Sequence, residues 1–192
     1  MDKAWCREAG TKTYVETGHL LRRLRAVELE ITQHMPPDRH RRLQTRETLG
    51  LKELRDAALL CHGLAERRGE KIGVTHWENH DHDAVARIQK SGENQFFPLQ
   101  LKQLPPDDIN AKVTLQKIID LLPSKYPKSP LLTVGISLNR DTRISFDKLN
   151  IPSMNIGGLF FFGAVKPDQS EWLLWGDALS HGAHATIFKY PD

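Results

Sequence analysis

DAVARIQKSGENQFFPLQLK, residues 83–102, predicts two β-strands joined by a tight turn, and this hairpin decides the fold that we expect. A turn centred on Gly92-Glu93 places Asp83 directly opposite Lys102. Gln100 and Lys102 are two residues apart in an extended strand, so their side chains share one face. The pairing therefore predicts that an acid, an amide and an ammonium group converge on one patch, where a divalent cation and a phosphate can bind.

The other face of the same hairpin is a test of this register. It carries only apolar residues, with small side chains opposite large ones: Ala84 opposite Leu101, Ala86 opposite Leu99 and Ile88 opposite Phe97. A slip of one residue would exchange the two faces and bury the polar groups. The alternation thus favours a hairpin whose apolar face covers a core.

Composition and length indicate one α/β domain of ordinary globular character. The chain has 192 residues, is 39% hydrophobic and 27% charged, and carries a net charge of +3, which permits a polyanionic partner. No apolar run is long enough to cross a bilayer, and MDKAWCREAG has charges where a signal peptide would be apolar. With only two cysteines, a disulfide framework is not indicated. We therefore expect a cytoplasmic protein with no membrane partner.

Periodicity along the chain predicts a mixture of helices and strands. Helices are expected over 12–34, 46–68 and 109–122, and strands in KIGVTHW, in the hairpin (83–90 and 95–103), and in LLTVGISLN, GGLFFFGAV, EWLLWGDAL and HATIFKY. The expected fold class is α/β, with a mixed central sheet flanked by helices and a β-rich C-terminal tail. Residues 1–45 are interpreted as a helical N-terminal extension and 46–192 as the α/β domain, in a single domain overall.

The order helix, strand, strand, strand, helix, strand resembles that of the PD-(D/E)XK nuclease superfamily. Asp83 opens the second strand, Gln100-Leu101-Lys102 ends the third, and Glu53 stands on the helix before the first. The pattern is most similar to the Mrr-like and Holliday-resolvase-like members, in which glutamine precedes x-Lys. It spans about residues 48–139 and implies a restriction-endonuclease-like fold and a metal-dependent DNA endonuclease acting in restriction, repair or defence.

The resemblance also implies the residues of the site. Glu53, Asp83, Gln100 and Lys102 would be catalytic, and Asp83, Gln100 and the Leu101 carbonyl would hold Mg²⁺ or Mn²⁺. The ion would polarise the scissile phosphate and lower the pKa of a bound water. Lys102 would hold that water or offset the charge that grows on the phosphate.

A non-catalytic function is the alternative. Glutamine at position 100 removes one negative charge from the metal site, which also suits a nuclease-like fold that acts as an immunity- or antitoxin-type interaction module or as a DNA-binding module. The hairpin 156–179 carries Phe160-Phe161-Phe162, Trp172 and Trp175. These aromatic residues are interpreted as core packing, or else as a homodimer or partner interface or a base-stacking platform.

Other reactive residues have simpler interpretations. His76, His80 and His82 with Asp81 and Asp83 form a cluster in HWENHDHD, but no cysteine or HExxH pattern supports zinc there, so a solvated turn is expected. The same holds for His181 and His184. Cys61 lies on the apolar stripe of a helix, as a packed thiol does. The basic segments HLLRRLR and DRHRRLQTR are read as a solvated helix face or as a phosphate-contacting arm.

Overall fold

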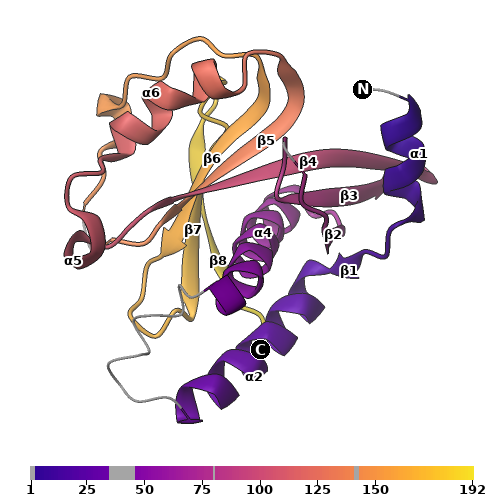
Figure 1. The fold of residues 1–192 in the computed structure, drawn as a ribbon, viewed down its shortest axis with the longest axis horizontal. Coiled ribbons are helices and arrows are strands. Elements are labelled where there is room, and N and C mark those ends of the chain that lie inside the picture. The colour runs from indigo at the N-terminus through magenta and orange to yellow at the C-terminus, as the bar shows by residue number, and fades with distance from the viewer. Residues whose placement is uncertain (1–2, 35–45, 80, 141–142) are drawn as a thin grey trace.

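The computed structural model describes residues 3–34, 46–79, 81–140 and 143–192, and these form a mixed sheet with helices on both faces (Figure 1). The helices are α1 (Lys3–Thr11), α2 (Thr17–His34), α4 (Arg46–Arg68), α5 (Asp107–Asn110) and α6 (Leu115–Lys125), with a short 3₁₀ turn η1 (Phe146–Lys148). The strands are β1 (Val15–Glu16), β2 (Ile72–His76), β3 (Ala84–Lys90), β4 (Glu93–Leu104), β5 (Ser129–Leu138), β6 (Ile156–Ala164), β7 (Glu171–Gly176) and β8 (His184–Lys189).

The described strands form one eight-stranded sheet in chain order. Strands β1 to β4 are antiparallel neighbours, β4, β5 and β6 run parallel, and β6 to β8 are antiparallel again. The sheet curls, so that β3 and β4 run across the direction of β7 and β8 in Figure 1. This confirms the predicted α/β class and mixed sheet.

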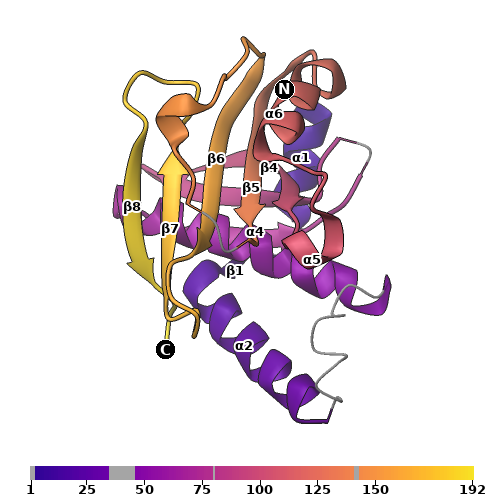
Figure 2. The same ribbon diagram turned by 90° about the vertical axis from the view of Figure 1, so that its left-hand side faces the viewer.

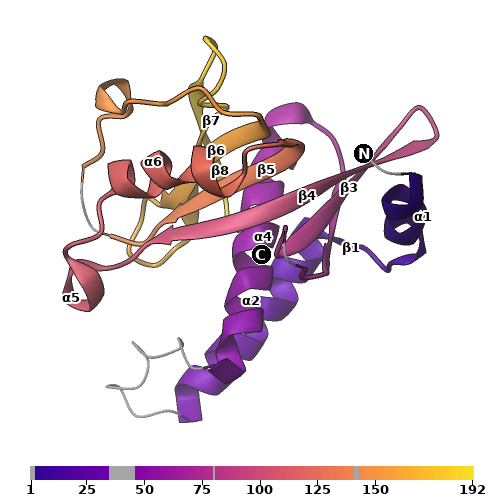
Figure 3. The same cartoon turned by 45° about the horizontal axis from the view of Figure 1, so that its top comes forward.

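Helices α4 and α6 cover opposite faces of this sheet. Helix α4 contacts every strand from β2 to β8, and its buried Leu59, Leu60 and Cys61 lie in one apolar core. Helix α6 buries Leu115, Ile119 and Leu122 in a second core on the other face (Figures 2 and 3). Each face of the sheet is thus sealed by a helix, and polar groups accumulate where the strands extend past them.

Helix α4 has the bounds that the sequence predicts, because the two features that set them, apolar spacing and a terminal glycine, both act locally. Its apolar residues recur at helical spacing, and Gly69 ends it with a φ of 64°, a left-handed conformation that suits glycine. The N-terminal segment joins the same core: Leu20, Leu21 and Leu24 of α2 pack with the residues of α4, and β1 pairs with β2.

The hairpin forms as predicted, but its register differs by two residues. Ala84 pairs with Leu99 and not with Leu101, and Lys90 pairs with Glu93. The turn residues are Ser91 and Gly92, with φ of 52° and 83°. Both positions of this tight two-residue turn need positive φ, so a turn on Gly92-Glu93 would force that conformation on glutamate. A shift of two residues keeps every side chain on its predicted face.

Two predicted helices differ from their expected bounds. The helix predicted over 12–34 starts at Thr17, because the Glu16 carboxylate accepts hydrogen bonds from the backbone N–H groups of Gly18 (2.9 Å) and His19 (2.8 Å). The helix predicted over 109–122 is two helices, α5 and α6, and the Thr114 hydroxyl caps the second by accepting from Lys117 N. Hydroxyl and carboxylate caps therefore override the apolar periodicity at both starts.

The aromatic residues of the β6–β7 hairpin belong to the core. Phe160, Phe161, Phe162 and Trp172 are buried, and Trp175 stacks on Phe146 at 4.3 Å between ring centroids. The packing interpretation holds for these side chains, which present no aromatic platform. Among the described residues, no helix combines the length and the apolar character that a bilayer span requires.

Candidate functional site

The start of β3 and the end of β4 bring three of the predicted site residues into contact. Asp83 Oδ2 accepts a hydrogen bond from the backbone N–H of Leu101 at 2.6 Å and another from Nε2 of Gln100. The backbone N–H of Asp83 donates to the Leu99 carbonyl at 2.9 Å, which fixes the position of the acid. Asp83 therefore lies opposite Gln100, and not opposite Lys102 as predicted.

The same contacts arrange oxygen atoms for a hard cation. The hydrogen bond from Gln100 Nε2 leaves Oε1 as the acceptor of that amide. Within a strand, the N–H and C=O of one residue point to the same side, so the Leu101 carbonyl is directed to the side of Asp83. A carboxylate, an amide oxygen and a carbonyl form the kind of donor set that Mg²⁺ or Mn²⁺ accepts, so the residues fit the expected ion.

Lys102 lies on the α6 face of the sheet, next to the end of that helix. Its Nζ is 5.9 Å from the centroid of the Tyr126 ring, and Lys125 Nζ is 5.8 Å from the same ring. Burial lowers the pKa of Lys102, and the nearby Lys125 ammonium lowers it further, whereas Asp83 and Glu53 act to raise it. The half-buried Lys102 and the exposed Lys125 thus lie beside the same tyrosine ring.

Tyr126 is a residue of this site that the sequence did not reveal. Its side chain is 5% exposed, and its hydroxyl has no hydrogen-bond partner within the described residues. Burial raises the pKa of Tyr126 to about 12, and the Asp83 and Asp81 carboxylates contribute to the increase. The phenol therefore stays protonated and offers an unused donor close to Asp83.

Glu53 joins the site from α4. Burial raises its pKa, and the carboxylates of Asp83 and Glu78 raise it further, while His76 and Lys52 act to lower it. The charges of Glu53 and Asp83 therefore act on each other. Of the four residues predicted as catalytic, Asp83 and Gln100 are in direct contact, and Glu53 and Lys102 interact with Asp83 through charge.

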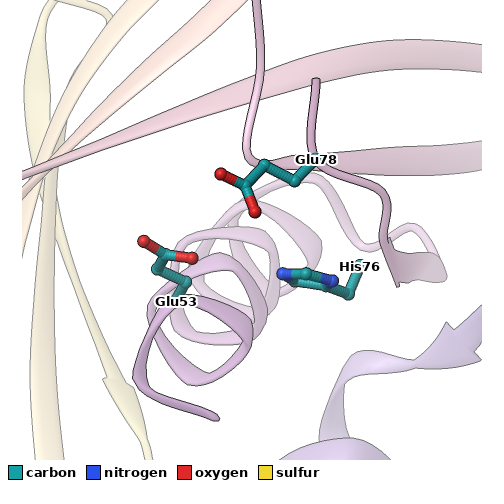
Figure 4. Close-up of side chains that lie close together, drawn as sticks. All are labelled: Glu53, His76 and Glu78. Atoms are coloured by element: carbon teal, nitrogen blue, oxygen red, sulfur yellow. The ribbon is translucent and has the colours of Figure 1, made fainter. Parts of the chain in front are cut away.

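A second group of potential ligands meets beside Glu53. The ligand atoms of Glu53, His76 and Glu78 all lie within 4.8 Å of one another. Figure 4 shows Glu53 on α4 and, facing it, His76 at the end of β2 and Glu78 just beyond that strand. The segment HWENHDHD contains both His76 and Glu78, but its sequence pattern groups His76 with His80 and His82 and gives no sign of the contact with Glu53 on α4.

The predicted His/Asp cluster is divided by the fold. His82 is 1% exposed, and its ring packs edge-on against Trp5 and Trp77. Trp5 of α1 stacks on Trp77 with centroids 5.7 Å apart and planes at 15°. His82 is thus a core residue of the 77–82 loop, while His76 faces the helix, and His80 lies outside the described residues.

The 77–82 loop is held by its own hydrogen bonds as well. The side-chain oxygen of Asn79 accepts from the backbone N–H groups of Asp81 (2.8 Å) and His82 (3.0 Å), and Asn79 N donates to the His82 carbonyl (2.9 Å). Together with the Trp5–Trp77 stack, these bonds hold Asn79, Asp81 and His82 in place.

The remaining candidates show ordinary structural roles. Burial raises the pKa of the Cys61 thiol, as expected of a packed side chain. His184 Nδ1 is 3.0 Å from the Gly182 carbonyl, and within the described segments neither His181 nor His184 belongs to a group of three potential metal ligands. Of the basic segments, 38–45 lies outside the described residues.

A cavity of about 810 Å³ lies where the parallel strands β4, β5 and β6 end. Lys52, the residue before Glu53 in the sequence, is part of its lining. The lining also includes Arg55, Arg140 and Lys166. Arg140 pairs with Asp107 (3.0 Å), Lys166 with Glu171 (2.8 Å) and Arg55 with Glu28 (2.8 Å), and Lys52 donates to Gln103. These cations already have partners, so the cavity alone does not specify an anion.

Comparison of the chain with protein-family models, with curated proteins and with solved structures finds no match in any of the three. The chemistry of the site therefore has to be argued from its own residues.

Proposed function

We propose that this protein is a metal-dependent nuclease that hydrolyses phosphodiester bonds in DNA, with a restriction-endonuclease-like arrangement of its core. One observation carries the proposal: the end of β4 brings the Gln100 amide and the Leu101 backbone N–H into hydrogen-bond contact with the carboxylate of Asp83, just before β3. These residues are far apart in the sequence, and the register of the hairpin could have separated them.

The order of elements supports the same function. Helix α4, the antiparallel strands β2, β3 and β4, helix α6 and the parallel strand β5 follow in the sequence that the PD-(D/E)XK resemblance implies. The polar groups of the hairpin lie just past the last pair of β3 and β4, Ala84 with Leu99. Gln100 is buried, whereas Asp83 and Lys102 are partly exposed, so solvent reaches the carboxylate and the ammonium.

The residues divide the chemical work. Asp83, the Gln100 side-chain oxygen and the Leu101 carbonyl would hold Mg²⁺ or Mn²⁺, which polarises the phosphate and lowers the pKa of a bound water. Lys102, half-buried and cationic, is placed to orient that water and to offset charge on the phosphate. Lys125, an exposed cation whose charge acts on Lys102, is suited to bind a non-bridging oxygen.

Cleavage assays test the proposal. The protein is incubated with single-stranded, double-stranded and branched DNA in Mg²⁺ or Mn²⁺, and Asp83→Asn is compared with Asp81→Asn. Asparagine at position 83 retains an oxygen to accept the Leu101 N–H but loses the charge, so cleavage falls by at least about 100-fold while the fold persists. Asp81 is exposed and two residues away, and its variant keeps the wild-type rate. Equal rates for wild type and Asp83→Asn would refute the proposed site.

The non-catalytic alternative makes a different prediction in the same experiment. A nuclease-like module that only binds DNA or a protein partner cleaves none of the three substrates in either metal. Calorimetry with Mn²⁺ in the presence of DNA separates the two functions, since the enzyme binds metal through Asp83 and the module need not. Absence of both cleavage and metal binding would replace the nuclease proposal by the interaction function, including the predicted partner surface on 156–179.

A further inference from the structure

The group Glu53, His76 and Glu78 has ligand atoms that no other part of the described chain uses. All three side chains lack a hydrogen bond or an ion pair among the described residues, although their ligand atoms are within 4.8 Å of each other. Some other acids of the fold are engaged: Glu16 accepts two backbone N–H groups, Glu28 pairs with Arg55 and Glu171 pairs with Lys166. The Glu53, His76 and Glu78 group differs from these acids, because its three potential ligands converge and keep their ligand atoms available to an ion.

Charge in this group is unbalanced. Glu53 is partly buried, and a carboxylate oxygen of Glu78 lies within 4.8 Å of one of its own. Bringing carboxylates together without a cation costs free energy, and an ion pair or a bound metal ordinarily offsets this cost. The ammonium of Lys52, the residue before Glu53, donates to Gln103 instead.

The three ligands stand on rigid supports. His76 is the last residue of β2 and pairs with Ala84 of β3, and Glu53 lies inside the long helix α4. Glu78 follows Trp77, whose ring is stacked on Trp5 and has Lys12 Nζ at 4.5 Å from its centroid. A metal site needs its ligands held in place before the ion arrives, and these elements hold them. His76 and Glu78 are exposed, so solvent reaches the group.

We propose that Glu53, His76 and Glu78 bind a divalent transition-metal ion at a position separate from the Asp83, Gln100 and Leu101 oxygens. Imidazole nitrogen is a good ligand for Zn²⁺ and other late transition metals, while Mg²⁺ prefers oxygen. One histidine and two carboxylates leave open coordination positions for water or a phosphate oxygen. The binding site stands on its own ligands, and only a part in hydrolysis rests on the function proposed above.

Metal titration of the whole protein tests the site without DNA. Metal-stripped protein is titrated with Zn²⁺, Mn²⁺ and Mg²⁺ by calorimetry, and Co²⁺ is used as a spectroscopic probe of histidine ligation. We expect affinity in the order Zn²⁺, Mn²⁺, Mg²⁺. His76→Ala and Glu78→Gln weaken Zn²⁺ binding by more than about tenfold, since even outer-shell changes cost about 10- to 100-fold. His181→Ala, at an exposed loop histidine, is the matched control and binds as wild type does.

Asp83→Asn separates this inference from the nuclease proposal. It retains Zn²⁺ binding at the His76 site, whether or not the wild type cleaves DNA. A protein that binds Zn²⁺ through His76 but never cleaves DNA supports the metal site and refutes hydrolysis. Cleavage in Mg²⁺ by a protein whose Zn²⁺ binding is unchanged in His76→Ala refutes the site and leaves hydrolysis intact. Thermal unfolding of the metal-free variants checks folding, which these exposed positions leave unchanged.

Discussion

The two halves of the candidate site differ in whether the protein satisfies its own acids. Asp83 accepts hydrogen bonds from Leu101 N and Gln100 Nε2, so the fold itself positions the carboxylate of the hairpin half. Glu53, His76 and Glu78 have no such partners within the described residues. An acid with donors contributes to folding, whereas neighbouring acids without donors repel each other until one is protonated or a cation binds. Hydrogen bonds of the fold thus hold one half, and the other half keeps ligands that the described residues leave unpaired.

The largest expected effect is that of a substitution at Lys102, which tests the hairpin half of the site. Lys102→Met keeps a long unbranched side chain but removes the charge beside Asp83. We expect the cleavage rate to fall by about 100- to 1000-fold, as for the loss of one group that stabilises transition-state charge. Stability stays the same or rises slightly, because burial already disfavours the ammonium.

Single-turnover cleavage assays and urea unfolding measure the two effects at Lys102. Lys189→Met, at an exposed position on β8, is the matched control and keeps the wild-type rate. A Lys102→Met protein that cleaves DNA normally would remove the hairpin half from catalysis.

Asp56 extends the comparison to an acid on α4, one turn after Glu53. Burial raises the pKa of Asp56 to about 6 from its usual 3.8, although Lys52 and Arg55 act to lower it. The fold therefore favours the protonated form. Protonated Asp56 stabilises the fold fully below its unfolded pKa of 3.8, and this stabilisation is lost as the pH rises through its folded pKa of about 6.

Asp56→Asn removes that dependence. Each pKa unit is worth about 1.4 kcal/mol, so the variant is more stable than wild type by about 2–3 kcal/mol at neutral and higher pH, and the difference vanishes near pH 4. Urea unfolding across this pH range measures it, with Asp120→Asn on the exposed side of α6 as control. A variant that is less stable than wild type at pH 8 would mean that the Asp56 carboxylate has donors that offset its burial.

Alanine substitutions in the two halves test directly whether the halves differ in their contribution to stability. Asp83→Ala leaves the Leu101 N–H and the Gln100 amide without their acceptor, which costs about 1–3 kcal/mol of unfolding free energy in the absence of metal. Glu78→Ala changes stability by less than about 0.5 kcal/mol, because the side chain is exposed and makes no such bond. Equal losses in the two variants, measured by urea unfolding in chelator, would erase the distinction between the halves.

Local signals in the sequence predicted the parts of this fold that depend on short-range physics. Alternation fixed the faces of the hairpin, and helical spacing with Gly69 fixed α4. The predicted register was wrong by two residues, because such a shift leaves every side chain on the same face of the hairpin. Only the positive φ of Ser91 and Gly92 distinguishes the observed turn from the predicted one. Helix starts at Glu16 and Thr114 depended on side-chain caps that periodicity does not register.

The contact between Asp83 and Gln100 was predictable, because the strand order determines it, whereas contacts between elements that meet from opposite sides were not. Glu53, Asp83, Gln100 and Lys102 come from the spacing and the resemblance, and their catalytic role stays a prediction. His76 and Glu78 were not assigned to Glu53, because the contact depends on how α4 crosses the end of β2, a packing outcome without a local signature. Tyr126 and Lys125 depend likewise on where α6 ends on the other face of the sheet.

The smallest expected effect concerns the support of the ion-dependent half. Trp5 of α1 stacks on Trp77, next to Glu78, and such pairs contribute about 0.5–1.5 kcal/mol. Trp5→Ala therefore weakens Zn²⁺ binding by about three- to tenfold, while cleavage in Mg²⁺ changes less than about twofold, since Asp83 keeps its own hydrogen bonds. Trp5→Phe retains an aromatic stack and binds Zn²⁺ nearly as wild type does. Calorimetry and cleavage assays on the same preparations compare the halves, and a parallel loss of both activities in Trp5→Ala would show that α1 supports the whole site and not the Glu53, His76 and Glu78 group alone.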